Sequence, residues 1–132
     1  MTLAHEIAAE VERIMVAAEL GVSIPGLLRA DERKRGFRVF LSGTVPWMLA
    51  AEWSPDCVVS LDGSTVRLVL ITATSPGGGA FGRLIAAIKG AGLSPCVIKP
   101  TREFQRALKC RGWRGRTVGS GFRSEDQWMP RA

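Results

Sequence analysis

Apolar residues recur every three or four positions near the start of the chain. The residues on this spacing are Leu3, Ile7, Val11, Ile14 and Ala18. Such a repeat places side chains on one face of a helix, and Thr2 and Gly21 can cap its two ends. The pattern therefore predicts an amphipathic helix over residues 2–20.

The middle of the chain contains two apolar runs with a turn signal between them. "CVVSL" (57–61) precedes Asp62-Gly63, and "TVRLVLIT" (65–72) follows. An Asp-Gly pair tolerates the positive φ of a tight hairpin turn. We therefore expect two antiparallel strands, the second of which leads into the glycine-rich segment "SPGGGAFG" (75–82).

The remaining patterns are shorter. They predict helices over 25–33, from the glycines to about 90–92, and over 101–110, a turn or short helix over 46–53, and strands over 36–43, 95–99 and 115–122. A hairpin followed by a strand–helix–strand crossover requires both antiparallel and parallel pairing. The expected fold class is thus α/β (α+β), with a mixed, mostly antiparallel sheet and flanking helices in one domain over residues 1–132.

The composition restricts the class of protein further. The chain has 132 residues, 46% hydrophobic and 23% charged, which suits one globular domain. Its apolar runs are shorter than the ~18 residues of a membrane span, and the Glu-rich opening differs from a signal peptide. Three cysteines without CxxC spacing and one histidine, His5, argue against zinc and disulfides. We expect a cytoplasmic protein without a membrane partner.

The net charge of +6 is concentrated in the last quarter of the chain. Residues 99–132 contain nine Lys or Arg and three Asp or Glu. This excess points to an anionic partner or to a solvated basic face. Nucleic acid is one such partner, but we do not favour it, because no recognition motif is present and aromatic residues do not alternate with the charges.

The glycine-rich segment is the main functional signal. A glycine turn between a strand and a helix presents backbone N–H groups at the positive end of the helix dipole, which binds anions. A Walker A loop is excluded because Arg83-Leu84 stand where Lys and a hydroxyl are required. The dinucleotide pattern G-x-G-x-x-G is present, but Lys99 occupies the place of its ribose-binding acid and the preceding hairpin does not suit a parallel sheet.

A third interpretation rests on "SPGGGA" together with "PCVIK", "TREFQRALKCR" and Gly112-Trp113 downstream. In order and spacing these segments resemble the GNAT superfamily of N-acetyltransferases, whose cofactor loop is R/Q-x-x-G-x-G/A. The resemblance covers residues 57–122, and the first 56 residues only loosely. It implies a GNAT-like fold that binds acetyl-CoA or another acyl-CoA. By this resemblance the cofactor would lie on Leu70, Ile71, Thr72, Gly77, Gly78, Gly79, Ala80, Gly82 and Arg83.

Two departures from the GNAT pattern concern catalysis. Ser75 replaces the usual Arg or Gln, a loss for which Arg83 can compensate, and the chain has no tyrosine to protonate the leaving thiolate. The strand before the loop also lacks a carboxylate. Transfer to an amine usually needs a base, and the candidates that remain for this role are Glu52 and Glu103, with Asp56 also considered.

The resemblance therefore leads to two hypotheses. The first is an acyl-CoA-dependent N-acyltransferase acting on an unknown amine. The alternative is a catalytically inactive GNAT-like structural or assembly protein with protein partners, for example a bacteriophage virion or internal-core component. That alternative would move the expected location from the cytoplasm to the virion.

Overall fold

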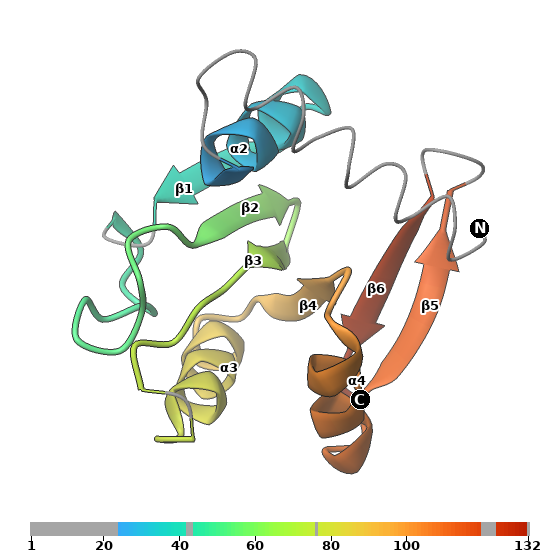
Figure 1. The fold of residues 1–132 in the computed structure, drawn as a ribbon. Helices are drawn as coiled ribbons and strands as arrows, with labels where there is room; N and C mark the ends of the chain where they lie inside the picture. Colours follow the sequence, from blue (N-terminus) through green and yellow to red (C-terminus); the bar gives the residue numbers. More distant parts are fainter. Residues whose placement is uncertain (1–23, 42–43, 76, 120–123, 132) are drawn as a thin grey trace.

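A computed structural model describes residues 24–41, 44–75, 77–119 and 124–131 (Figure 1). The predicted opening helix over 2–20 and His5 lie outside these residues. The helices are α2 (Ile24–Lys34), α3 (Ala80–Gly90) and α4 (Arg102–Cys110). The strands are β1 (Arg38–Leu41), β2 (Val58–Asp62), β3 (Thr65–Leu70), β4 (Ser94–Ile98), β5 (Arg114–Val118) and β6 (Glu125–Met129).

The six strands form one mixed, mostly antiparallel sheet in the order β1-β2-β3-β4-β6-β5. Only β3 and β4 pair in parallel, and α3 makes the crossover between them. The expected α+β class is confirmed. The antiparallel β2–β3 pair also excludes the all-parallel sheet that a dinucleotide-binding fold requires.

The hairpin between β2 and β3 forms where the Asp-Gly signal predicts a turn. Asp62 pairs with Thr65, so Gly63 and Ser64 are the two central residues. Gly63 has a φ of 59°, a conformation that glycine adopts without the steric cost of a Cβ. The turn therefore begins one residue later than the Asp62-Gly63 pair suggested.

The C-terminal end of the fold differs from the prediction. Instead of one strand over 115–122, the structure has β5 and β6, which pair antiparallel with each other. β6 lies between β4 and β5, and β5 forms an edge of the sheet. The sequence of β6, "EDQWM", is too polar for a strand to be recognised by hydrophobic pattern, because its buried residues are one tryptophan and one glutamate.

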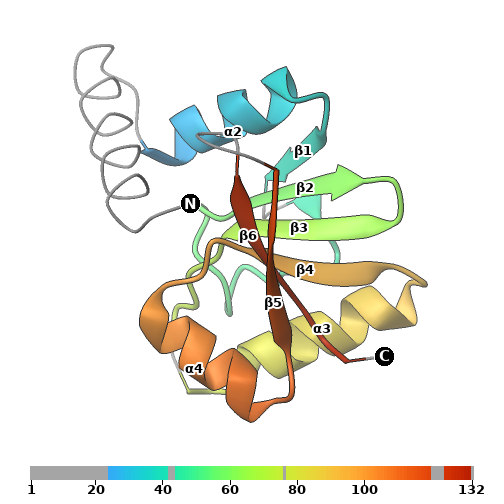
Figure 2. The same cartoon turned by 90° about the vertical axis from the view of Figure 1, so that its right-hand side faces the viewer.

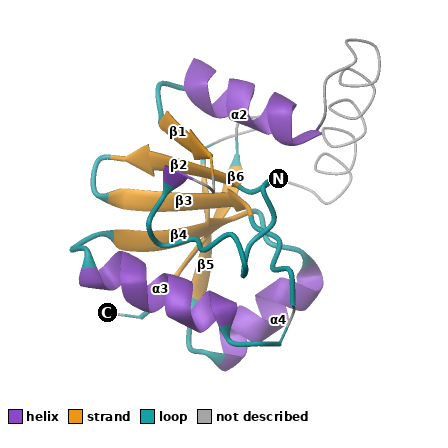
Figure 3. Cartoon of the chain, turned by 90° about the vertical axis from the view of Figure 1, so that its left-hand side faces the viewer, coloured by secondary structure: helices purple, strands orange, loops and turns teal. Residues whose placement is uncertain are grey.

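Helices cover both faces of the sheet (Figures 1 and 3). The face toward α3 carries the main core, to which Val59, Val66, Leu68, Val97 and Leu84 belong. Trp53, Trp113 and Trp128 also belong to this core. Strand alternation turns Ser60 and Arg67 to the opposite face, where α2 contributes Glu32.

β3 contains an irregularity that affects the strands beside it. Val58 pairs with Leu70 and Val59 with Leu68, so β3 has one more residue, Val69, than β2 at this point. Such a β-bulge bends its strand and inverts the alternation beyond it. The pairing of β3 with β4 ends at Leu68 and Val97, and β4 continues beside β6 through Ile98. The two parallel strands therefore separate at the bulge.

Candidate functional site

The glycine loop lies between β3 and α3, as predicted. Gly77 and Gly79 have φ values of 85° and 81°, which residues with a Cβ rarely adopt. Gly79 is the N-cap of α3, and no side chain caps the helix. The first N–H groups of α3 are therefore left for solvent or a ligand.

The segment between β3 and the loop has one free edge. The Ser54 N–H donates to the Thr72 carbonyl at 2.9 Å, and the Thr74 N–H donates to the Glu52 carbonyl at 2.9 Å. Successive residues of a strand direct their backbone N–H and C=O groups to opposite sides. The N–H and C=O groups of Ile71 and Ala73 therefore point toward β4. Of the residues predicted to bind the cofactor arm, Ile71 has its backbone groups on the side of β4. The Thr72 carbonyl accepts from Ser54 on the other side.

Glu52 and Arg83, both singled out from the sequence, form an ion pair beside the loop. The Arg83 Nε donates to Glu52 Oε2 at 2.6 Å, and its Nη2 contacts the same oxygen. The same Nη2 donates to the Gly78 carbonyl at 3.0 Å. The Arg83 side chain is 59% exposed and that of Glu52 is 16% exposed. Arg83 thus links the candidate base to the candidate phosphate loop.

A second cation lies near the start of α3. The Arg111 guanidinium is 5.3 Å from the centre of the Phe81 ring, and a Cβ added at Gly82 would lie 3.7 Å from its Nη1. Phe81 in turn packs edge-on against Phe104 of α4 at 5.2 Å. The sequence did not indicate this contact, because Arg111 follows a different helix.

Other predicted residues have different positions. Glu103 is exposed in the first turn of α4, where the helix dipole stabilises a negative charge. It forms no ion pair within the described residues. Asp56 is exposed as well. Ala80 is buried as the first residue of α3. Of the candidate bases, only Glu52 forms an ion pair beside the glycine segment, with Arg83, within the part of the chain that the structure describes.

Trp53, next to Glu52, holds a polar atom without a partner. Its backbone forms an isolated antiparallel bridge with Ala73, and the residue is 4% exposed. Its indole Nε1–H is buried and donates to no partner among the described residues. Buried N–H groups without a hydrogen bond are rare, and a bound water or ligand is a common explanation.

A buried ion cluster lies on the face of the sheet toward α2. The Arg67 guanidinium donates to Glu32 at 2.9 Å and to Glu125 at 2.7 Å, and it lies 4.2 Å from the centre of the Phe37 ring. The Ser60 hydroxyl also donates to Glu32, and Arg35 donates to Glu125. Two carboxylates and two guanidiniums meet here, so the cluster has no net charge.

The pKa values follow from these contacts. Burial alone would raise the pKa of Glu125, but hydrogen bonds from Arg67, Arg35 and Gln127 outweigh it and lower the pKa to about 2. Burial opposes the charge of Arg67 as well, yet its hydrogen bonds with Glu125 and Glu32 raise its pKa. Burial raises the pKa of the nearby Cys96 thiol to about 11, so this cysteine is an inert core residue.

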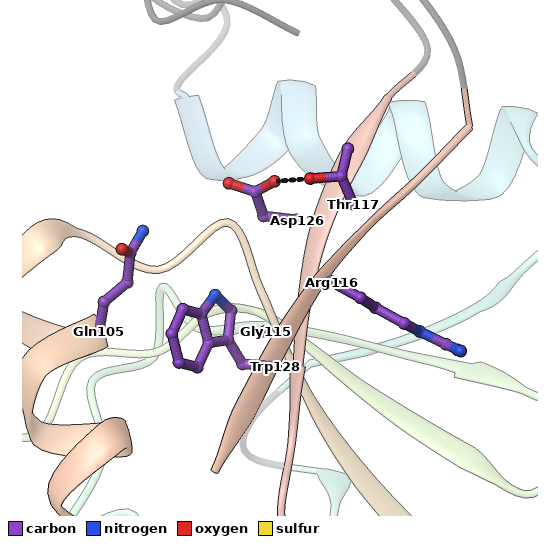
Figure 4. A pocket seen from close by; sticks show the side chains of 6 residues that line it. All are labelled: Gln105, Gly115, Arg116, Thr117, Asp126 and Trp128. Atoms are coloured by element: carbon purple, nitrogen blue, oxygen red, sulfur yellow. Dashed lines mark hydrogen bonds between the residues drawn. The ribbon is translucent and has the colours of Figure 1, made fainter.

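A hollow of about 330 Å³ lies between α4 and the β5–β6 hairpin (Figure 4). Its lining residues are Gln105, Gly115, Arg116, Thr117, Asp126 and Trp128. Thr117 donates to Asp126 at 2.9 Å, and Gln105 donates to the Pro100 carbonyl. The Arg116 side chain points away from Gln105 and Trp128 (Figure 4). Several polar groups of the hollow are therefore already paired.

Two kinds of site are not found in the described part of the chain. None of its helices has the length and apolar character needed to cross a bilayer. Its His, Cys, Asp and Glu side chains do not gather into a potential metal site. Comparison with protein-family models, curated proteins and solved structures finds no match.

Proposed function

We propose that this protein is an acyl-CoA-dependent N-acyltransferase with a GNAT-like fold, acting on an amine that the site does not identify. The observation that carries the proposal is the β-bulge at Val69. It parts β3 from β4 directly before a glycine loop that opens a helix. A strand edge and a helix N-terminus are thereby adjacent, which suits a ligand with an amide-containing arm and a pyrophosphate.

The pyrophosphate would bind at the start of α3. The uncapped N–H groups there carry the positive end of the helix dipole. Bare backbone at Gly78 lets phosphate oxygens approach closely. Arg111, beside Gly82, adds a positive charge. These groups supply the phosphate contacts that Ser75 cannot provide.

The arm of the acyl-CoA would extend along the free edge at Ile71 and Ala73. Its amides can pair with the backbone groups there as a further strand would. The thioester would then lie in the opening between β3 and β4. The orphan indole N–H of Trp53, whose backbone pairs with Ala73, is a candidate donor to a carbonyl of the ligand.

Glu52 is the proposed base. In the free protein Arg83 holds its carboxylate. A bound phosphate competes for this guanidinium and leaves Glu52 able to accept a proton from the ammonium form of the acceptor. The amine nitrogen then attacks the thioester carbonyl and the C–S bond breaks. The proton that the nitrogen loses on becoming an amide passes through water to the thiolate, since the chain has no tyrosine. Positioning the amine against the thioester by itself lowers the activation free energy by several kcal/mol.

Titration calorimetry with acetyl-CoA tests the binding step, with Gly78→Glu and Gly78→Ala as a matched pair. Both add a Cβ that would lie 3.3 Å from the Ser75 carbonyl, but only Glu adds charge. We expect Gly78→Glu to lose binding and Gly78→Ala to retain a measurable part of it. Absence of heat and of thermal stabilisation in the wild type at millimolar acetyl-CoA would refute the proposal, because binding to the folded state must stabilise it.

Thiol release with a panel of amines tests the chemical step. We expect Glu52→Gln to reduce turnover about 10²–10⁴-fold while acetyl-CoA binding persists, and Glu103→Gln to leave turnover unchanged. Equal turnover in all three proteins would refute Glu52 as the base.

A second candidate is a protein that binds acyl-CoA without catalysis, or one with a structural role. The ion pair that occupies Glu52 and the lack of tyrosine favour it. Tight binding with no turnover on any amine would support the non-catalytic role. No binding and no turnover would support the structural one.

A further inference from the structure

Three cations of α4 lie on one side of the helix. Arg102, Arg106 and Lys109 follow the i, i+4, i+7 spacing, which aligns side chains in a stripe. The core-facing side of the helix is formed instead by Phe104 and the buried Leu108. We call Arg102, Arg106 and Lys109 the α4 stripe. All three are exposed.

Basic side chains far outnumber acidic ones in the segment that carries the stripe. The segment Arg102–Val118 contains six Lys or Arg and one acid, Glu103. None of the six forms an ion pair within the described residues, although Arg35, Arg67 and Arg83 elsewhere do. Neighbouring like charges repel one another, and a bound anion would relieve this repulsion.

The α4 stripe has the dimensions of a nucleic-acid backbone. Seven residues of helix rise about 10.5 Å, which equals the advance of about three phosphates of one strand along the axis of a duplex, ~3.4 Å for each. The stripe thus matches about three successive phosphates when α4 lies along the duplex axis. The edge strand β5 lies across the hollow from α4, and both elements are at the front of Figure 2. The Arg116 side chain points away from Gln105 of α4 (Figure 4), so the contact is assigned to the α4 stripe alone.

We propose that the α4 stripe binds the phosphate backbone of double-stranded nucleic acid without reading its sequence. Single strands are a poorer match, because the nearby Trp113 and Trp128 are 7% and 8% exposed and offer no platform for stacked bases. A flexible acidic peptide would lose entropy on aligning with a fixed row of charges, whereas duplex phosphates are already spaced. This site is separate from the glycine loop, so it stands or falls independently of acyl-CoA binding.

Fluorescence anisotropy with a labelled duplex of mixed sequence tests the proposal. The wild type is compared with Arg102→Gln/Arg106→Gln/Lys109→Gln and with the control Arg33→Gln/Lys34→Gln/Lys89→Gln. The control removes three exposed cations from α2 and α3, so both variants have the same net charge. Circular dichroism and melting temperature confirm that each is folded.

We expect wild-type dissociation constants of about 10⁻⁴ to 10⁻⁶ M near physiological salt, tightening as salt is lowered. The stripe variant should bind at least tenfold more weakly at low salt. Its slope of log affinity against log salt should be shallower by roughly 2 to 3, as expected for three lost phosphate contacts. The control should retain most of the affinity and the slope.

Three results would overturn the proposal. The first is equal weakening of the stripe variant and the control, which would mean that only net charge matters. The second is the absence of duplex binding by the wild type at 50 mM salt. The third is competition by poly-glutamate as effective, per charge, as competition by unlabelled duplex, which would indicate an acidic protein surface instead.

Discussion

Arg67 is 2% exposed in the middle of the apolar strand β3. An isolated buried charge would cost several kcal/mol, and Arg67 avoids this by pairing with Glu32 and Glu125. The sequence shows an arginine between Val66 and Leu68, which is unusual for a core strand. It does not show the partners, because they are 35 and 58 positions away and are brought together only by the sheet order. This buried cluster was therefore missed.

Substituting Arg67→Met leaves the carboxylates of Glu32 and Glu125 buried without their main partner. The free energy of unfolding should therefore fall by about 3–5 kcal/mol. Replacing Glu32 and Glu125 by Leu as well should recover most of the loss, since a packed apolar cluster can substitute for a buried ion pair. Urea denaturation measures both changes. A single variant as stable as the wild type would contradict the role given to the cluster.

The elements themselves show which parts of a fold local patterns can predict. The β2–β3 hairpin, α3 and α4 with its Thr101 N-cap lie close to where the sequence predicts them, because turn residues, caps and helical periodicity are local signals. β6 was missed because its neighbours β4 and β5 determine its burial. The bulge at Val69 was missed too, because its cause is the register against β2 and not the composition of β3.

Gly115 of β5 provides a prediction for this hairpin. A Cβ there would lie 2.3 Å from Trp128 Cε2, so Gly115→Ala must displace the indole or the strand. We expect a loss of about 1–3 kcal/mol of stability, measured by chemical denaturation. Gly90→Ala at the end of α3 is the control, since a Cβ there meets nothing within 4 Å. Equal stability of both variants would show that the hairpin adjusts freely.

At the scale of the molecule, the ion cluster joins parts of the fold that are otherwise connected by few contacts. Glu32 belongs to α2, Arg67 to β3 and Glu125 to β6. The face toward α3 is held by an apolar core, whereas the opposite face depends on these charges. Stability should therefore respond to acid more than the composition of the core suggests.

The pKa of Glu125 determines the direction of this response. Its folded-state value of about 2 lies below the ordinary value for glutamate, about 4.3. Between these values the unfolded chain binds more protons, so the free energy of unfolding should be fully maintained above about pH 4.5 and fall as the pH drops toward 2. Urea midpoints between pH 7 and 2.5 measure this. The triple variant Glu32→Leu/Arg67→Met/Glu125→Leu should lose less stability over this pH range. An equal loss of stability would assign the acid sensitivity to other groups.

The distance along the chain between Arg67 and Glu125 has a consequence for synthesis. A ribosome that adds about 5–20 residues per second takes roughly 3–12 s to travel the 58 positions between them. For that interval the nascent chain carries the arginine without its second carboxylate. A message broken before codon 125 therefore yields a chain that can form its hairpin but lacks one of the two carboxylates that hold Arg67. We expect such fragments to be substrates for quality-control proteases.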